Sequence, residues 1–222
     1  MRDSWGVGLA TGLYGVSFGA ISVATGLSVA QACVLSLLMF TGASQFAFVG
    51  VLAAGGSPWS GAMTAALLGT RNTLYGLTLA PLLGWRSLRR AGAAHLVIDE
   101  STAMAATRAT RAAARAGFLH TGVAIFLLWN LATLLGAVAG DRIGDPRTYG
   151  LDAAVGAAFL ALLWPRLASR DNQVVALAAA AVALALATVT GAGIPVLAAG
   201  GVALLAGLLD RARRGDGPGS LP

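Results

Sequence analysis

Long runs of apolar residues, separated by short polar breaks, form the pattern of this chain. Each run is close to the roughly 20 residues that a helix needs to cross the hydrocarbon core of a bilayer. The pattern therefore predicts an all-α fold, a polytopic transmembrane helix bundle with about seven membrane segments. We expect these segments at Trp5–Ser28, Gln31–Ala54, Pro58–Gly84, Phe118–Ala139, Leu151–Ala168, Val174–Thr190 and Ile194–Leu209.

The composition supports a membrane location. Of the 222 residues, 57% are hydrophobic and only 11% are charged, whereas soluble domains carry about 25% charged residues. The apolar runs leave no stretch for a separate soluble domain. We expect an integral membrane domain over residues 1–210 and a disordered basic cytoplasmic tail over residues 211–222.

The distribution of arginine predicts the orientation of the segments. Arginines are concentrated between Arg86 and Arg115, which makes this stretch the natural cytoplasmic loop. Alternation outward from this loop puts eleven arginines inside and two outside, and it places the N-terminus outside. The net charge of +6 is thus explained by insertion into a lipid bilayer, and no nucleic-acid partner is expected.

The first segment is rich in glycine, and two interpretations of it stay open. Gly8 and Gly12, like Gly15 and Gly19, have the spacing of small residues at closely packed helix interfaces. Alternatively, this segment is a broken or re-entrant helix whose exposed backbone lines a cavity. In that case the N-terminus lies inside and six helices span fully.

The sequence lacks the residues that several classes of active site require. The chain contains no lysine, which excludes a Walker A nucleotide site and a retinal-type Schiff base. It also lacks an HExxH motif and a carboxylate pair within two separate apolar helices. We therefore expect neither an enzyme nor a bound cofactor or metal, and any transport must draw its energy from a gradient or a partner.

One arginine stands near the middle of the uncharged stretch from Pro58 to Gly84. At about 1.5 Å of rise per residue, the Cα atom of Arg71 lies about 19 Å from either end of a helix over this stretch. An ionised side chain is costly at that depth, so such residues face a protein interior or a water-filled cavity and mark a ligand or ion route. Arg71 therefore predicts that the membrane domain is a transporter.

Other polar residues fall at a similar depth in the second and third segments. A guanidinium holds a carboxylate by two parallel hydrogen bonds, so Arg71 is a candidate anchor for an amino-acid carboxyl group. The alternative is a buried structural pair of Arg71 with Asp99 or Glu100, if their helix tucks into the bundle. The predicted substrate-binding residues are Arg71, Gln45, Ser44, Thr41, Asn72 and Tyr75.

Asp99 and Glu100 are candidates for proton coupling. Two adjacent carboxylates repel each other, so one of them takes up a proton more readily when it is desolvated. The alternative is that both acids lie at a helix N-terminus, where they stabilise the helix dipole and move no proton.

Three blocks carry a resemblance to a known family. FTGASQFAFVGVLAAGG from Phe40, RNTLYGLTLAPLL from Arg71 and DESTAMA from Asp99 resemble the large subunit of AzlC-type branched-chain amino acid exporters. The similarity extends over the chain, including LYGVSFGA and LDAAVGAAFLALLWPRL. The chain departs from the family pattern at Thr70 and Asn72, where asparagine and histidine are usual, and it lacks a proline ahead of Phe18.

The resemblance implies export of valine, leucine or isoleucine across the bacterial cell membrane by a multi-pass permease subunit. It also implies a small AzlD-type membrane subunit as partner. These residues are compatible with such a substrate: Arg71 with its carboxylate, and Gln45 and Ser44 with its ammonium group or with backbone-like contacts. The alternatives are the translocating subunit of an ATP-driven amino acid importer and a membrane-embedded enzyme.

Overall fold

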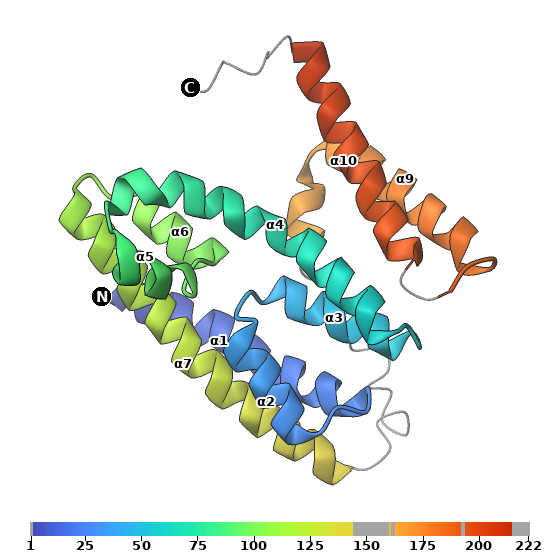
Figure 1. The fold of residues 1–222 in the computed structure, drawn as a ribbon, viewed down its shortest axis with the longest axis horizontal. Helices are drawn as coiled ribbons and strands as arrows, with labels where there is room; N and C mark the ends of the chain where they lie inside the picture. Colours follow the sequence, from blue (N-terminus) through green and yellow to red (C-terminus); the bar gives the residue numbers. More distant parts are fainter. Residues whose placement is uncertain (1, 144–159, 161–162, 192–193, 215–222) are drawn as a thin grey trace.

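A computed structural model describes residues 2–143, 160, 163–191 and 194–214, and every element in this part of the chain is helical (Figure 1). The all-α helix bundle is therefore confirmed. The helices are α1 (Arg2–Ala24), α2 (Val29–Leu38), α3 (Ala43–Ala53), α4 (Pro58–Leu83), α5 (Ser87–Ala94), α6 (Asp99–Ala106), α7 (Arg111–Ile143), the 3₁₀ helix η2 (Trp164–Ala168), α9 (Arg170–Ala187) and α10 (Ile194–Arg214).

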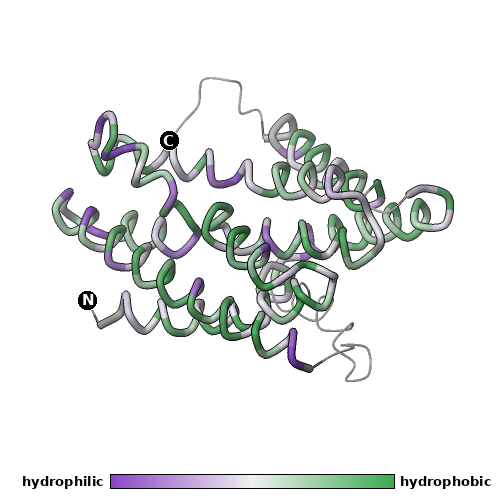
Figure 2. The backbone as a smooth tube through the Cα atoms, turned by 60° about the horizontal axis from the view of Figure 1, so that its bottom comes forward, coloured by the Kyte–Doolittle hydropathy of each residue, from purple (hydrophilic) through white to green (hydrophobic). Residues whose placement is uncertain are grey.

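Three described helices are long and apolar enough to cross a membrane, namely Ser4–Ala24, Arg111–Arg142 and Arg170–Ala187. Figure 2 shows hydrophobic residues along most of the helices and strongly hydrophilic ones mainly at helix ends and connections. Helix α4 has 26 residues and is also long enough, but Arg71 and its polar neighbours lower its hydropathy.

The glycines of the first segment pack α1 against α7. A Cβ atom added at Gly12 would lie 2.6 Å from the Cβ of Leu128, and one at Gly15 would lie 2.5 Å from the carbonyl oxygen of Trp129. A Cβ atom added at Gly19 would lie closer still to the carbonyl oxygen of Thr133. Helix α1 is continuous, so of the two interpretations of this segment the close-packing one is correct.

The glycine contacts also fix the direction of α1. Gly8 meets Ala124 and Gly15 meets Ala132, so residue numbers rise together along the two helices and α1 runs parallel to α7. The N-terminus therefore lies on the same side as the start of α7, at the end of the molecule where α5 and α6 lie (Figure 1). The alternation rule, which placed it on the opposite side, was wrong because one later segment does not cross.

That segment is the second one, which turns back instead of crossing. The chain approaches the molecular centre along α2, since Ser36 meets Thr133 of α7 and Phe40, just after α2, meets Phe126, two turns closer to the N-terminus of α7. Helix α3 then returns, with Ser44 beside Gly69 and Phe48 beside Gly61 of α4. We call α2 and α3 together, Val29–Ala53, the outer hairpin.

A glycine makes the turn of the outer hairpin possible. Gly42 precedes α3 with a φ of 63° and a ψ of −88°, a conformation that residues with a side chain rarely adopt. The tip of this hairpin therefore lies between Leu38 and Ala43, where the expected helix Gln31–Ala54 is interrupted.

A second hairpin enters from the other side. Helix α5 leads to Leu96, which packs on Gly122 of α7, and α6 returns until Met104 packs on Gly117 near the start of α7. The stretch expected as a cytoplasmic loop, Arg86–Arg115, is thus two short helices that reach the centre of the bundle. We call α5 and α6, Ser87–Ala106, the inner hairpin.

The two halves of this arrangement share a sequence signature. Leu13–Gly15 of α1 and Leu74–Gly76 of α4 have the same sequence, Leu-Tyr-Gly, and each helix is followed by a hairpin. Helices α1 and α4 run in opposite directions, because the C-terminus of α4 meets the N-terminus of α7 through Arg115 and the carbonyl of Leu83. The unit of one helix and one hairpin therefore occurs twice with inverted topology.

The C-terminal part is attached more loosely. Helices α9 and α10 pack on each other, and Gly200 of α10 lies against Leu67 of α4. Most of the expected segment Leu151–Ala168 falls outside the described residues. Helix α10 continues to Arg214, four residues into the stretch expected as a tail, and residues 215–222 are also outside the described part.

We predict that Gly15→Ala lowers the stability of the protein by about 1–3 kcal/mol, because the new methyl group must push the Trp129 carbonyl away. The measurement is thermal unfolding in detergent. Gly6→Ala is the matched control, since its methyl group would meet no atom within 4 Å. Equal unfolding temperatures for the two variants would contradict the close approach of α1 and α7.

Candidate functional site

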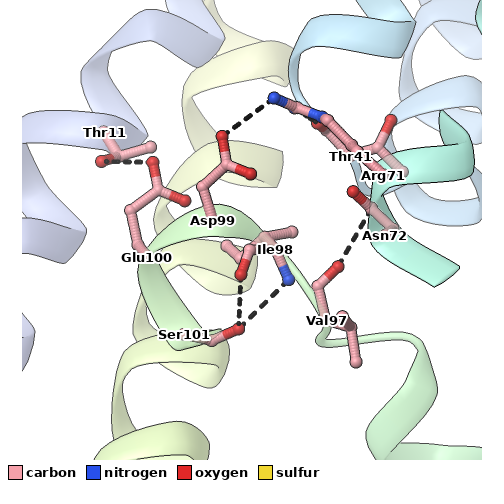
Figure 3. A network of polar contacts seen from close by, with 9 residues as sticks. All are labelled: Thr11, Thr41, Arg71, Asn72, Val97, Ile98, Asp99, Glu100 and Ser101. Carbon is pink, nitrogen blue, oxygen red and sulfur yellow. Dashed lines mark hydrogen bonds and ion pairs between the residues drawn. The ribbon is translucent and has the colours of Figure 1, made fainter. Parts of the chain in front are cut away.

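Arg71 occupies the point where the two hairpin tips meet. It lies at the middle of α4, and its side chain is 19% exposed. Its Nη1 atom donates to Oδ2 of Asp99 at 3.0 Å, on the inner hairpin. Its Nη2 atom lies 3.5 Å from the carbonyl oxygen of Thr41, at the tip of the outer hairpin. Arg71 thus connects the hairpins (Figure 3).

The next residue of α4 adds a second connection. Asn72 donates from Nδ2 to the carbonyl oxygen of Val97 at 3.1 Å. Val97 lies in the interruption between α5 and α6, where the backbone makes no continuous helical hydrogen bonds. Because unsatisfied carbonyls are costly inside a bilayer, Arg71 and Asn72 each stabilise one of the two helix interruptions.

The two returning helices begin in the same way. In α3, Oε1 of Gln45 accepts a hydrogen bond from the backbone N–H of Gly42 at 3.1 Å. In α6, Oγ of Ser101 accepts one from the backbone N–H of Ile98, also at 3.1 Å. Both side chains are fully buried, and both belong to the third residue of their helix. They hold the hairpin tips in shape.

The acidic pair opens α6 and faces two different helices. Asp99 turns toward Arg71, whereas Oε1 of Glu100 accepts from the hydroxyl of Thr11 on α1 at 3.4 Å (Figure 3). The expected pairing of Arg71 with Asp99 is therefore present, and so is the expected helix N-terminus. Through these two adjacent carboxylates the inner hairpin contacts both α1 and α4, the two helices of the inverted repeat.

Aromatic side chains complete the contact between the tips. The ring of Phe40 lies 6.2 Å from that of His95, and both pack edge-on against Phe126 of α7, with centroids at 5.1 and 5.5 Å. Phe18 of α1, Phe46 of α3 and Trp129 of α7 also pack against one another. This second aromatic group joins the outer hairpin to α1 and α7.

The site retains unused hydrogen-bonding capacity. Among the described residues, no partner reaches the buried hydroxyls of Thr41 and Ser44, Nε of Arg71 or Oδ1 of Asn72. Buried polar atoms are normally satisfied by protein or water, so a cluster of unsatisfied ones calls for an additional partner such as a bound water molecule or a polar ligand. Donors and acceptors lie together, as recognition of a molecule with both charged groups and hydrogen-bonding groups requires.

The structure brings most of the predicted binding residues together. Arg71, Asn72, Thr41 and Ser44 surround the hairpin tips. Gln45 lies behind them, with its amide oxygen engaged by Gly42. Tyr75 is one turn further along α4, where it packs against a hydrophobic cluster that contains Leu79 and Leu83. Whether these residues bind a substrate stays a prediction.

Thr11, Val97 and Ser101 were not predicted from the sequence as part of the site. The available signals were the Leu-Tyr-Gly repeat and the polar residue three positions into each returning helix. Together, these two signals would have aligned α1 with α4 and the start of α3 with the start of α6.

Comparison with known proteins agrees with this description. The profile of the AzlC protein family matches residues 6–143, which include α1, both hairpins, α4 and α7. Inner membrane protein YgaZ of Escherichia coli (strain K12) is 30% identical over 147 residues, which cover 63% of this chain and 59% of that protein. The chain thus spans less than two thirds of the length of this relative.

No solved structure matches the chain. The family match covers more than half of the sequence, and the chain belongs to the AzlC family of transport-related membrane proteins.

Proposed function

We propose that this protein is the large subunit of a permease that exports branched-chain and other small apolar amino acids across the bacterial cell membrane. It works with a small AzlD-type membrane subunit and uses a gradient. The observation that carries the proposal is the position of Arg71, at mid-depth, between two helix interruptions that enter from opposite sides. In transporters with discontinuous helices, substrate sites lie at such interruptions.

Arg71 supplies the carboxylate site. Its fork of N–H groups already holds one carboxylate, that of Asp99, at 3.0 Å. A substrate carboxylate competes for the same donors, and its arrival frees Asp99 from the arginine. Binding therefore loosens the inner hairpin, because Asp99 is its charged attachment to α4.

The remaining parts of the substrate find matching groups. The hydroxyls of Thr41 and Ser44 and the amide oxygen of Asn72 are acceptors for an ammonium group. Apolar side chains, including Phe40 and Val97, lie near these groups. The aliphatic side chain of a substrate would therefore enter an apolar environment. A substrate with a charged side chain would leave that charge unpaired at this depth.

The acidic pair offers a route to coupling. Asp99 and Glu100 are adjacent at the start of α6, and their mutual repulsion favours a proton on one of them. Glu100 has the hydroxyl of Thr11 beside it, 3.4 Å away. Export driven by an inward proton gradient requires proton and substrate to move in opposite directions, so in this scheme the pair takes up a proton on the outer side after the substrate has left and releases it on the inner side before the next substrate binds.

Arg71→Lys tests carboxylate recognition. Lysine keeps the positive charge but loses the planar fork, so valine efflux from preloaded cells should fall by about tenfold or more. The protein should stay in the membrane at the parental amount. Arg89→Lys is the matched control, because Arg89 is exposed on α5, away from the hairpin tips, and it should export normally. Parental efflux by the Arg71 variant would exclude recognition through the fork.

Reconstitution tests the partner and the energy source. In liposomes without ATP, the protein with an AzlD-type subunit should release valine or leucine when a proton gradient is imposed, and the protein alone should not. Robust efflux by the single chain would remove the need for the partner. Transport that occurs only with ATP and a nucleotide-binding subunit would favour the importer instead.

A further inference from the structure

Two cavities approach Asn72 from opposite directions. The outer cavity, of about 820 Å³, follows α2 from Leu27 to Met39 and ends at Thr41, Asn72 and Val97. The inner cavity, of about 390 Å³, follows the second half of α4 from Asn72 to Leu83 and faces Arg90 of α5. Since α2 starts on the outer side and α5 on the inner side, the cavities lie on opposite halves of the protein.

The cavities share three lining residues, Asn72, Ala94 and Val97. The 3.1 Å hydrogen bond from Asn72 Nδ2 to the Val97 carbonyl oxygen lies among these residues. These three residues thus lie at the partition between the two cavities.

We propose that the two cavities are the outer and inner halves of the substrate pathway and that Asn72 with the Val97 carbonyl forms its constriction. The identity of the transported substrate, a small apolar amino acid, rests on the proposed function. The existence of the pathway does not depend on it. Asn72 follows Arg71 on α4, and of the two only Asn72 lines the cavities.

The charge and polarity along the route suit such a substrate. Arg90 places a positive charge at the inner cavity, where it attracts the carboxylate of an amino acid that arrives from the cytoplasm. The outer cavity is lined mainly by apolar residues, and its polar lining residues are Gln31, Thr41, Asn72 and His95. Its volume lies in the range of about 300–1,000 Å³ that is typical of small-molecule sites.

A filled inner cavity should stop transport. Gly76 lines this cavity, and a Cβ atom added there meets no atom within 4 Å, so Gly76→Leu places its side chain in the cavity without a collision at the backbone. Efflux should fall by about tenfold or more. Gly6→Leu is the matched control, because Gly6 also has no atom near an added Cβ and lies away from both cavities. Its efflux should stay at the parental rate.

Thiol labelling locates the pathway whether or not a substrate is known. In the full chain with Cys33→Ala, an impermeant maleimide should modify Leu38→Cys in the outer cavity from outside and Gly76→Cys in the inner cavity from inside. Each should react about tenfold faster than its neighbour Leu37→Cys or Leu74→Cys, which are exposed but line neither cavity, because thiolates form in water and not in lipid.

The outcomes separate the pathway from the proposed function. Labelling as described, without valine transport by the parental protein, would keep the pathway and overturn the substrate. Labelling of both cavity cysteines from one side, or no faster than their neighbours, would overturn the pathway, and so would parental efflux by Gly76→Leu.

Discussion

A helix that is interrupted inside a membrane leaves backbone groups that neither lipid nor water satisfies, and this constraint governs the centre of the molecule. Two interruptions occur here, and they meet. Arg71 and Asn72, adjacent on α4, donate to carbonyls at the two interruptions, while Gln45 and Ser101 accept N–H groups at the starts of the returning helices. The deep arginine is tolerated because it has a carboxylate and a carbonyl as partners.

The polar contacts that satisfy the two interruptions also allow a ligand to change the centre of the molecule. Ionic and polar contacts that bridge two hairpins are also contacts that a zwitterionic ligand can replace, whereas the α1–α7 interface, closed by Gly12, Gly15 and Gly19, has little room to change. The protein thus combines a rigid pair of helices with two short hairpins that are held by polar contacts around Arg71 and by buried hydrophobic side chains such as Phe46 and Ile98. In the proposed mechanism, transport is the exchange of Asp99 for a substrate carboxylate on Arg71, followed by movement of the hairpins.

The sequence predicted the centre better than the path of the chain. Arg71 was predictable because a charge in a long apolar run needs a partner, and Asp99 was its nearest candidate. The hairpin Val29–Ala53 was not, because an apolar run of this length is compatible with crossing and with turning back; only tertiary contacts, such as Ser44 beside Gly69, distinguish the two. The glycines of α1 were compatible with close packing or with an interruption, and the structure shows close packing. An interruption occurs instead at Gly42, whose positive φ cannot be predicted from hydropathy.

In this fold the chain between α1 and α4 enters and leaves the membrane on one side. The measurement is the side from which an impermeant thiol reagent reaches Ala30→Cys and Ala54→Cys, at the two ends of the outer hairpin, in a Cys33→Ala background. Both should react in intact cells, whereas Leu88→Cys, exposed on α5, should react only in inside-out vesicles. Reaction of Ala30→Cys and Ala54→Cys from opposite sides would show that this segment crosses the membrane and that the outer hairpin does not exist.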